Sequence, residues 1–122
     1  MEHTNDFVIL CNDAKTRIKE IDANDVEQLL ACAEPYCLID VREEQEYQAG
    51  HLPNAQHLSK GWIEAKIHHI AKNKAEKIIL YCGGGNRSAL AADNLQKMGY
   101  KNVLSLRNGF RGWIQAGKSV HT

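Results

Sequence analysis

The stretch that decides the fold is IILYCGGGNRS, at residues 78–88. A short apolar run ends on Cys82, three glycines follow, and Ser88 opens a segment of good helix formers. This order of strand, glycine loop and helix predicts a concave nest of backbone N–H groups, to which the helix N-terminus adds partial positive charge. Cys82 is expected at the mouth of this anion-binding nest.

The residues around Cys82 favour an ionised thiol. A thiol is nucleophilic only as its thiolate, and an unperturbed cysteine has a pKa of about 8.5. A helix N-terminus and a nearby cation favour the ionised form, and Arg87 supplies a permanent cation. The glycines at 83–85 permit backbone turns that a side chain would forbid. The stretch therefore predicts a site for a reactive thiolate, or for an anion attached to that sulfur.

The alternative is that Cys82 is a packing residue. Cysteine is among the most buried residue types, and a cysteine that ends an apolar strand usually lies in the core. Packing, however, does not require three glycines and an arginine directly after the cysteine. We therefore favour the reactive cysteine.

Length and charge limit the classes of function. The chain has 122 residues, enough for one domain with its own core. Its 15 basic and 15 acidic side chains give a formal net charge of zero, which argues against a general nucleic-acid-binding or anionic-membrane surface. No apolar run approaches the roughly 20 residues of a membrane span. The apolar stretch at residues 7–11 is too short for a signal peptide and lacks a basic lead, so we expect a cytoplasmic protein.

The other cysteines, Cys11, Cys32 and Cys37, are expected to be packing residues. Thiols stay reduced in the cytoplasm, so the four cysteines do not indicate a disulfide framework. Cys32 and Cys37 are too far apart for a CxxC pair and have no matching ligand set, which argues against a zinc site. We expect neither a metal nor a cofactor.

Hydrophobic periodicity and turn residues predict strands that alternate with helices. Strands are expected at residues 18–21, 36–41, 56–58, 77–81 and 102–106. Helices are expected at residues 3–17, between Asp22 and Pro35, at 43–49, at about 61–71, from Ser88 to Gly99, and around Phe110 to Ile114 before Gly117. The side chains expected to face inward from the helix at 61–71 are Trp62, Ile63, Ile67 and Ile70.

Such an alternation implies a parallel sheet that is covered by helices on both faces. Ligands bind sheets of this kind beyond the carboxyl ends of the strands. Cys82 follows one predicted strand and Asp40 lies near the end of another. Both residues are therefore expected at the ligand-binding edge of the sheet.

Three segments resemble the signatures of rhodanese domains. The first comprises LIDVRE at 38–43, EY at 46–47 and GHLPNA at 50–55, and the second is the loop CGGGNRS at 82–88. The third comprises GYKNV at 99–103 and LRNGFRGW at 106–113. They occur in the family's order, cover about residues 20–117, and are together far more specific than a cysteine and an arginine alone.

The resemblance implies an α/β fold, with a five-stranded, mainly parallel sheet and helices on both faces. The rhodanese domain would span residues 18–122, after an N-terminal helical extension at residues 1–17. The resemblance also implies a sulfurtransferase that works through a persulfide on Cys82. Cys82 would take the outer sulfur of a small anionic donor such as thiosulfate and pass it to cyanide or a thiol. A protein is a further candidate for donor or acceptor, whereas nucleic acids and membranes are not expected partners.

The resemblance also assigns roles to the neighbours of Cys82. Backbone N–H groups would hold the persulfide or the departing sulfite, and the substrate-binding residues would be Gly83, Gly84, Gly85, Asn86 and Arg87. Arg87 would help to bind the anionic donor. The residues that would support the loop are Asp40, Arg42 and Ser88.

Three further positions matter in this resemblance. His51 falls in the family's Gly-His-x-Pro turn, where a structural hydrogen bond is expected. Asn54 and Asn108 stand where glycine is frequent in the family. Asn tolerates positive φ, so both turns are expected to survive.

Two other functions stay open. One is a sulfur carrier or a non-catalytic binding module, although rhodanese-like domains of the second kind often lack the cysteine. The other is a phosphatase or arsenate reductase, because dual-specificity cell-cycle phosphatases share the fold and a loop with cysteine and arginine. Their loop has one more residue between these two. The shorter loop here, with four residues between Cys82 and Arg87, is expected to hold one sulfur atom better than a tetrahedral oxyanion. Thiosulfate and mercaptopyruvate both remain candidate donors.

Overall fold

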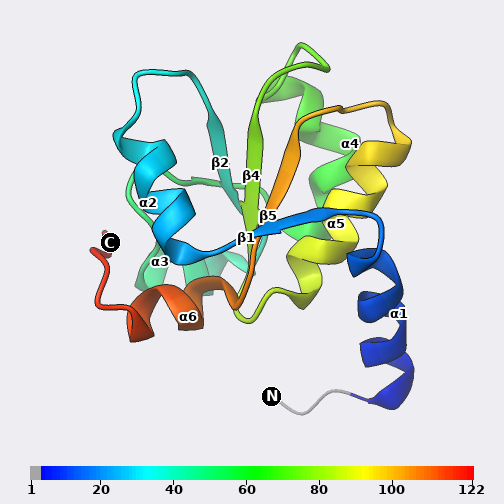
Figure 1. Ribbon diagram of the computed structural model, residues 1–122, viewed down its shortest axis with the longest axis horizontal. Helices are drawn as coiled ribbons and strands as arrows, with labels where there is room; N and C mark the ends of the chain where they lie inside the picture. The colour runs from blue at the N-terminus through cyan, green and yellow to red at the C-terminus, as the bar shows by residue number, and fades with distance from the viewer. Residues whose placement is uncertain (1–3) are drawn as a thin grey trace.

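The computed structural model describes residues 4–122 and contains a five-stranded sheet (Figure 1). Its strands are β1 (Lys19–Ile21), β2 (Cys37–Asp40), β3 (Gln56–His57), β4 (Ile78–Tyr81) and β5 (Val103–Leu106). The strand order is β1-β5-β4-β2-β3, and every neighbouring pair is parallel. The predicted α/β fold is confirmed, and the sheet is parallel throughout.

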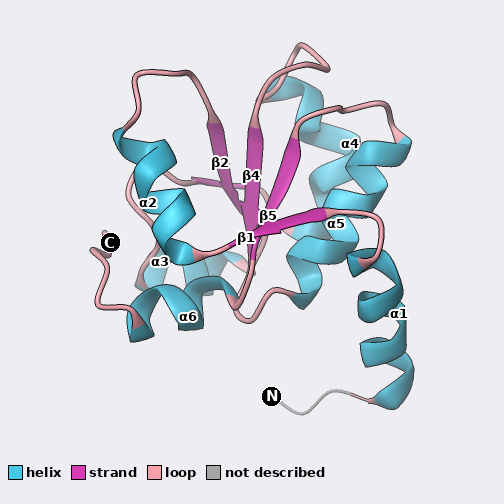
Figure 2. Cartoon of the chain, in the orientation of Figure 1, coloured by secondary structure: helices cyan, strands magenta, loops and turns pink. Residues whose placement is uncertain are grey.

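Helices cover both faces of the sheet. Within residues 4–122 the α-helices are α1 (Asn5–Lys15), α2 (Ala23–Ala31), α3 (Glu44–Ala49), α4 (Ile63–Lys66), α5 (Asn86–Lys97) and α6 (Gly109–Gln115). Two 3-10 turns, η1 (Lys60–Trp62) and η2 (Ile67–His69), flank α4. Figure 2 shows α1, α4 and α5 on one side of the sheet and α2, α3 and α6 on the other. None of the described helices is long and apolar enough to cross a membrane.

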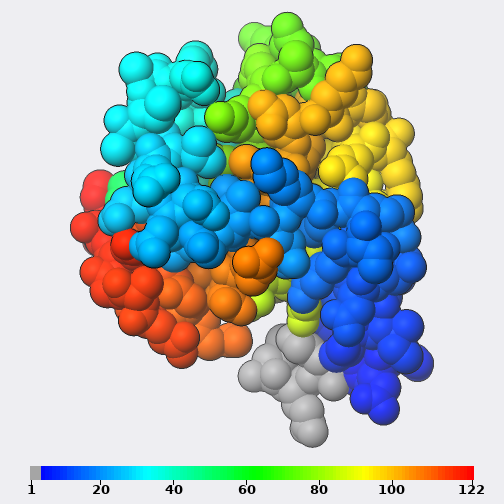
Figure 3. All heavy atoms as spheres, in the orientation of Figure 1, coloured from blue at the N-terminus to red at the C-terminus, as the bar shows by residue number. Residues whose placement is uncertain are grey.

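The alternation of side chains along β4 divides the core between the two faces. Successive residues of a strand point to opposite faces. Leu80 and Cys82 belong to the buried cluster that includes Leu95 of α5. Tyr81 belongs to the opposite cluster, with Trp113 of α6. Figure 3 shows that the atoms of α2 form the molecular surface next to α6 on this side of the sheet. The sheet thus places Cys82 on the side of α5.

Helix α5 begins at Asn86, two residues before the predicted start at Ser88. Gly85 precedes it with a φ of 102°, in the left-handed region that favours glycine. The carbonyl oxygen of Gly85 already accepts the N–H of Ala89 at 3.3 Å. Asn86 and Arg87 therefore form the first helical turn, and only the three glycines remain as loop.

The prediction of one regular helix at 61–71 is wrong, and so is the inward position of Trp62. The segment is made of η1, α4 and η2. A 3-10 turn has about 3.0 residues per turn rather than the 3.6 of an α-helix, so one helical face does not continue along the segment. Ile63 and Ile67 are fully buried and Ile70 is partly buried, as predicted. Trp62, in the first 3-10 turn, is 58% exposed.

Helix α1 is shorter than the predicted helix at 3–17. The hydroxyl of Thr4 accepts the N–H of Phe7 at 3.2 Å and caps the helix, while residue 3 lies outside the described part of the chain. Helix α1 packs along α5. Beyond its end, Arg17 forms an ion pair with Asp93 of α5 at 2.8 Å.

The three cysteines expected in the core differ in burial. Cys11 is buried, and Cys37 is half-buried with its thiol 3.5 Å from a carboxylate oxygen of Glu76. Burial, together with the hydrogen bond and charge of Glu76, raises the pKa of Cys37 to about 11. The expectation for Cys32 is wrong: α2 ends at Ala31, and the next residue is exposed where the chain leaves the helix.

Both asparagines that replace family glycines have positive φ. The angle is 68° at Asn54 and 64° at Asn108. Asparagine adopts this left-handed conformation more readily than most residues. The prediction that these turns survive without glycine is confirmed.

Candidate active site

Cys82 lies at the carboxyl end of β4, where the anion-binding nest was predicted. The residue is 1% exposed. Its Sγ accepts hydrogen bonds from the backbone N–H groups of Gly85, at 3.1 Å, and Ser88, at 3.4 Å. One donor comes from the glycine loop and the other from the first turn of α5, so both are oriented to stabilise negative charge on the sulfur.

Further backbone N–H groups of the loop and of the first turn of α5 are unpaired within the described part of the chain. Within residues 4–122, the backbone N–H groups of Gly83, Gly84, Asn86 and Arg87 have no hydrogen-bond partner. They lie in the loop and at the N-terminus of a helix of 12 residues. Unpaired amides at such a terminus form a binding site for an anion. The loop can therefore accept negatively charged atoms beyond the cysteine sulfur itself.

The start of α6 fixes the loop from outside. Phe110 donates its backbone N–H to the carbonyl oxygen of Cys82 at 2.7 Å, and Arg111 donates to that of Gly83 at 3.0 Å. Gly109, with a φ of 53°, lies so close that a Cβ there would overlap the carbonyl oxygen of Cys82. This close approach explains why the turn before α6 needs glycine at position 109.

A hydroxyl pair lies behind the sulfur. Ser88 Oγ is 3.6 Å from the sulfur of Cys82 and 2.8 Å from Ser105 Oγ on β5. Ser88 and Ser105 are both fully buried. The sequence pointed to Ser88 as loop support but not to Ser105, although a hydroxyl within an apolar strand was a signal. The pair ties the loop to the neighbouring strand.

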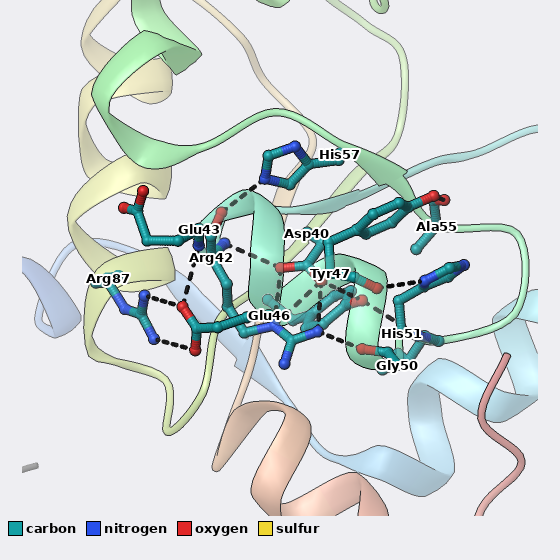
Figure 4. Close-up of polar contacts among 12 residues, drawn as sticks. Asp40, Arg42, Glu43, Glu46, Tyr47, Gly50, His51, Ala55, His57 and Arg87 are labelled. Carbon is teal, nitrogen blue, oxygen red and sulfur yellow. Dashed lines mark hydrogen bonds and ion pairs between the residues drawn. The ribbon is translucent and has the colours of Figure 1, made fainter. Parts of the chain in front are cut away.

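Arg87 lies beside the loop but already has an anionic partner. Its guanidinium forms an ion pair with Glu46 of α3 at 3.0 Å, with a second contact at 3.5 Å (Figure 4). Burial works against the charge of Arg87, but the hydrogen bond that it donates to Glu46 and the charges of Cys82 and Glu46 raise its pKa. Burial likewise opposes the charge of Glu46, whose pKa is nevertheless lowered by the hydrogen bond from Arg87. Arg87 is thus partly neutralised before any donor binds.

Asp40 and Arg42 form a buried ion pair at 2.7 Å. Tyr81 donates its hydroxyl to the same carboxylate at 2.8 Å and accepts the N–H of Leu52 at 3.1 Å. Arg42 also donates to the carbonyl oxygen of Gly50 at 2.6 Å. Figure 4 shows Asp40, Arg42 and Gly50 among these polar contacts. Within residues 4–122 no fully buried side-chain nitrogen or oxygen lacks a hydrogen-bond partner, as burial of charge requires.

The pair reaches the loop through an aromatic ring. The guanidinium carbon of Arg42 lies 4.2 Å from the ring centroid of Phe110, whose N–H holds the carbonyl oxygen of Cys82. The Asp40–Arg42 pair therefore contacts the loop through Phe110 rather than directly. Phe110 had no assigned role in the sequence.

The remaining predicted neighbours are also accounted for. The side-chain oxygen of Asn86 accepts a hydrogen bond from Lys15 of α1 at 2.9 Å, so this oxygen is already engaged outside the nest. His51 Nδ1 lies 2.8 Å from the carbonyl oxygen of Tyr47, and the two rings stack at 3.9 Å. The structural hydrogen bond predicted for His51 is confirmed.

Comparison with known proteins agrees with this geometry. Residues 22–116 match the family model of the rhodanese-like domain. A sulfurtransferase of Allochromatium vinosum is 34% identical over 103 residues, which is 84% of this chain and 94% of that protein. The putative sulfur carrier protein YrkF of Bacillus subtilis is 32% identical over 96 residues, or 79% of this chain; the match spans 51% of YrkF, about half its length.

A solved structure extends the similarity over the whole chain. A protein of unknown function from Rhodopseudomonas palustris, described as a possible tyrosine phosphatase, superposes with a TM-score of 0.87 at 28% identity. The match covers 99% of this chain and 98% of that one. The chain belongs to the rhodanese-like domain family.

Proposed function

We propose that this protein is a sulfurtransferase that moves a sulfane sulfur from a donor such as thiosulfate to cyanide or a thiol. The observation that carries the proposal is the buried sulfur of Cys82, which accepts two backbone N–H groups inside a loop with further unpaired N–H groups. Such a site suits a reaction whose intermediates are sulfur anions. The family's sulfurtransferase relatives support the same reaction class.

In the first step, the thiolate of Cys82 attacks the sulfane sulfur of thiosulfate. The S–S bond of the donor breaks, and sulfite leaves with the bonding electron pair. The products are the Cys82 persulfide anion and sulfite, so charge and electrons balance without a further reductant. The N–H groups of Gly85 and Ser88 would continue to stabilise the negative charge as it moves to the outer sulfur.

In the second step, the acceptor attacks the outer sulfur of the persulfide. Cyanide leaves as thiocyanate, or a thiolate leaves as a persulfide, and the electron pair of the broken S–S bond returns to Cys82. No proton has to be transferred by the protein. This agrees with a site built from backbone amides and hydroxyls rather than around a histidine.

The other predicted residues take supporting roles in this proposal. Gly83, Gly84 and Asn86 contribute backbone N–H groups to the anion, and Arg87 contributes charge next to it. Ser88 holds the sulfur from behind. Asp40 and Arg42 stabilise the loop through Phe110. A reducing compartment, which we propose to be the cytoplasm, would keep Cys82 a thiol between turnovers.

A sulfur carrier that exchanges sulfur with a protein is the second candidate. The observation that favours it is the similarity to a putative sulfur carrier protein, at 32% identity over 79% of this chain. A carrier would form the Cys82 persulfide yet turn over small donors slowly. Persulfide formation without appreciable thiocyanate production would select this candidate.

The phosphatase alternative is less well supported by the loop. The three glycines between Cys82 and α5 form a short cradle, and Arg87 is paired with Glu46. A phosphatase would need that arginine for the equatorial oxygens of a phosphate. Appreciable hydrolysis of an aryl phosphate by the purified chain would reverse this preference.

The experiment that tests the proposed function is thiocyanate production from thiosulfate and cyanide. We expect activity in the unmodified chain and none in Cys82→Ser. Cys32→Ser is the matched control because this thiol is exposed and far from the loop in sequence, and it should retain full activity. Activity that survives Cys82→Ser would refute the proposed reaction.

A further inference from the structure

The side chain of Arg111, which no step of the proposed reaction uses, places its guanidinium against the glycine loop. A Cβ at Gly84 would be 3.2 Å from Nη1 of Arg111 and 3.7 Å from its Cζ. The backbone N–H of the same residue donates to the carbonyl oxygen of Gly83 at 3.0 Å. Main chain and side chain of Arg111 therefore both contact the loop that holds Cys82.

Two guanidinium groups thus flank successive glycines of the loop. A Cβ at Gly83 would lie 3.1 Å from Nη2 of Arg87, as one at Gly84 would lie next to Arg111. The two arginines differ in their partners. Arg87 is paired with Glu46, whereas Arg111 is exposed and has no carboxylate partner within residues 4–122. Arg111 is the cation at this loop whose hydrogen-bond donors remain available.

We propose that Arg111 is a specificity-determining residue that binds the oxyanion end of a small anionic sulfur donor. This inference rests on the proposed function. A guanidinium presents parallel N–H groups that match a sulfonate or carboxylate, and it stays charged at every physiological pH. The substrate class is a small donor whose sulfane sulfur is attached to an oxyanion group, with that group at Arg111 and its sulfur at Cys82.

Glycine at position 84 leaves room for this arginine. A side chain there would meet the guanidinium at 3.2 Å, closer than ordinary van der Waals contact, so the guanidinium would have to shift by a few tenths of an ångström. Arg107 provides a comparison, because it lies on the same connection but interacts with Glu20 at 4.0 Å and is 54% exposed. Its guanidinium supplies a similar charge but is not among the atoms nearest to the loop glycines, since only the backbone Cα of Arg107 lies close to Gly85.

Sulfite binding to the Cys82→Ser protein tests this inference without any sulfur transfer. Calorimetric titration should give a dissociation constant about tenfold higher when Arg111→Gln is added, as expected for one lost charge-assisted hydrogen-bonding group. Arg107→Gln is the matched control and should leave sulfite affinity within twofold. Arg111→Lys should recover part of the affinity, because it restores the positive charge but not the parallel N–H groups of the guanidinium.

Equal sulfite affinity with and without the Arg111 guanidinium would overturn the inference, as would the absence of sulfite binding in the Cys82→Ser protein. In the unmodified chain, Arg111→Gln should raise KM for thiosulfate about tenfold with kcat changed less than twofold. A fall in kcat at constant KM would also contradict a docking role. Failure of the proposed function has a different signature: sulfite would bind through Arg111, but no donor would load Cys82.

Discussion

Phe110 holds the catalytic candidate Cys82 by donating its backbone N–H to the cysteine carbonyl oxygen at 2.7 Å, while its ring lies 4.2 Å from the guanidinium of Arg42. One residue of α6 therefore joins the buried ion pair beside β2 to the loop after β4. The position of the sulfur depends on this connection as well as on the loop's own glycines. Several measurable effects follow from it.

Gly109→Ala should displace the loop. Its Cβ would overlap the carbonyl oxygen of Cys82, and its φ of 53° is unfavourable for alanine. We expect a loss of about 3 kcal/mol in the free energy of unfolding, from overpacking and backbone strain together. Urea unfolding measures this loss, and sulfurtransfer should fall with it.

Gly99→Ala separates the cost of backbone strain from the cost of overpacking. Gly99 has a φ of 101° but no atom within 4 Å of its added Cβ. It should cost only the backbone strain, about 1–2 kcal/mol, and leave sulfurtransfer intact. Equal losses in the two variants would contradict the close approach of α6 to the loop.

Arg42→Met should leave the carboxylate of Asp40 buried without its cation. Removing one partner of a buried pair costs about 3–5 kcal/mol, because the remaining charge is uncompensated. The side chains of the pair are 5% and 0% exposed. Lys77→Met is the matched control, since its partner Glu34 is 72% exposed and such pairs contribute about 0–1 kcal/mol. Urea midpoints that shift equally in both variants would argue against a structural role for the buried pair.

Glu46→Gln should release Arg87 from its counterion. With the carboxylate gone, the free guanidinium should lower KM for thiosulfate about threefold, the size of one Coulomb interaction across several ångströms of water. Stability should change by less than about 1 kcal/mol because both side chains are partly exposed. Steady-state kinetics at low ionic strength provide the readout. An increase in KM would show that the ion pair positions Arg87 rather than weakens it.

The ion pair between Arg17, just beyond α1, and Asp93 of α5 predicts a pH-dependent stability. Hydrogen bonds from Arg17 lower the pKa of Asp93, whose side chain is 7% exposed. The charged carboxylate is therefore favoured in the folded state, so its stabilisation is complete above the ordinary Asp pKa of about 3.9 and is lost as the pH falls through the lowered value.

Asp93→Asn should accordingly be destabilised at pH 7 by about 1 kcal/mol, and the difference from the unmodified chain should shrink progressively below a pH of about 4. Urea unfolding at several pH values measures the difference. Arg17→Met should show the same trend, and the double variant should cost little more than either single change. A difference that stays constant down to pH 2 would contradict the lowered pKa of Asp93.

Local sequence predicted the strands and the nest because both are set within a few residues. The short apolar run of β4, which is buried throughout, and the run CGGGNRS each specify their own backbone. The prediction of one helix at 61–71 failed for a local reason as well. The 3-10 turns at both ends of α4 break the 3.6-residue period that the prediction assumed. Trp62 therefore lies on the surface.

The partners of the site residues were beyond sequence reasoning. Glu46 and Arg87 lie on different elements and meet only because α3 and α5 flank the same edge of the sheet. Ser105 meets Ser88 for the same reason, through the parallel register of β5 beside β4. Phe110 and Arg111 stood in a quoted signature, but nothing local indicated that α6 would contact the glycine loop.

Cys82 is the residue that we propose to carry the transferred sulfur. Intact-protein mass spectrometry after incubation with thiosulfate should show the gain of one sulfur atom, which cyanide then removes. The gain should be absent in Cys82→Ser and present in Cys32→Ser. A folded, reduced chain that gains no sulfur from thiosulfate or from another sulfane donor, or a gain that persists in Cys82→Ser, would contradict sulfur transfer through Cys82.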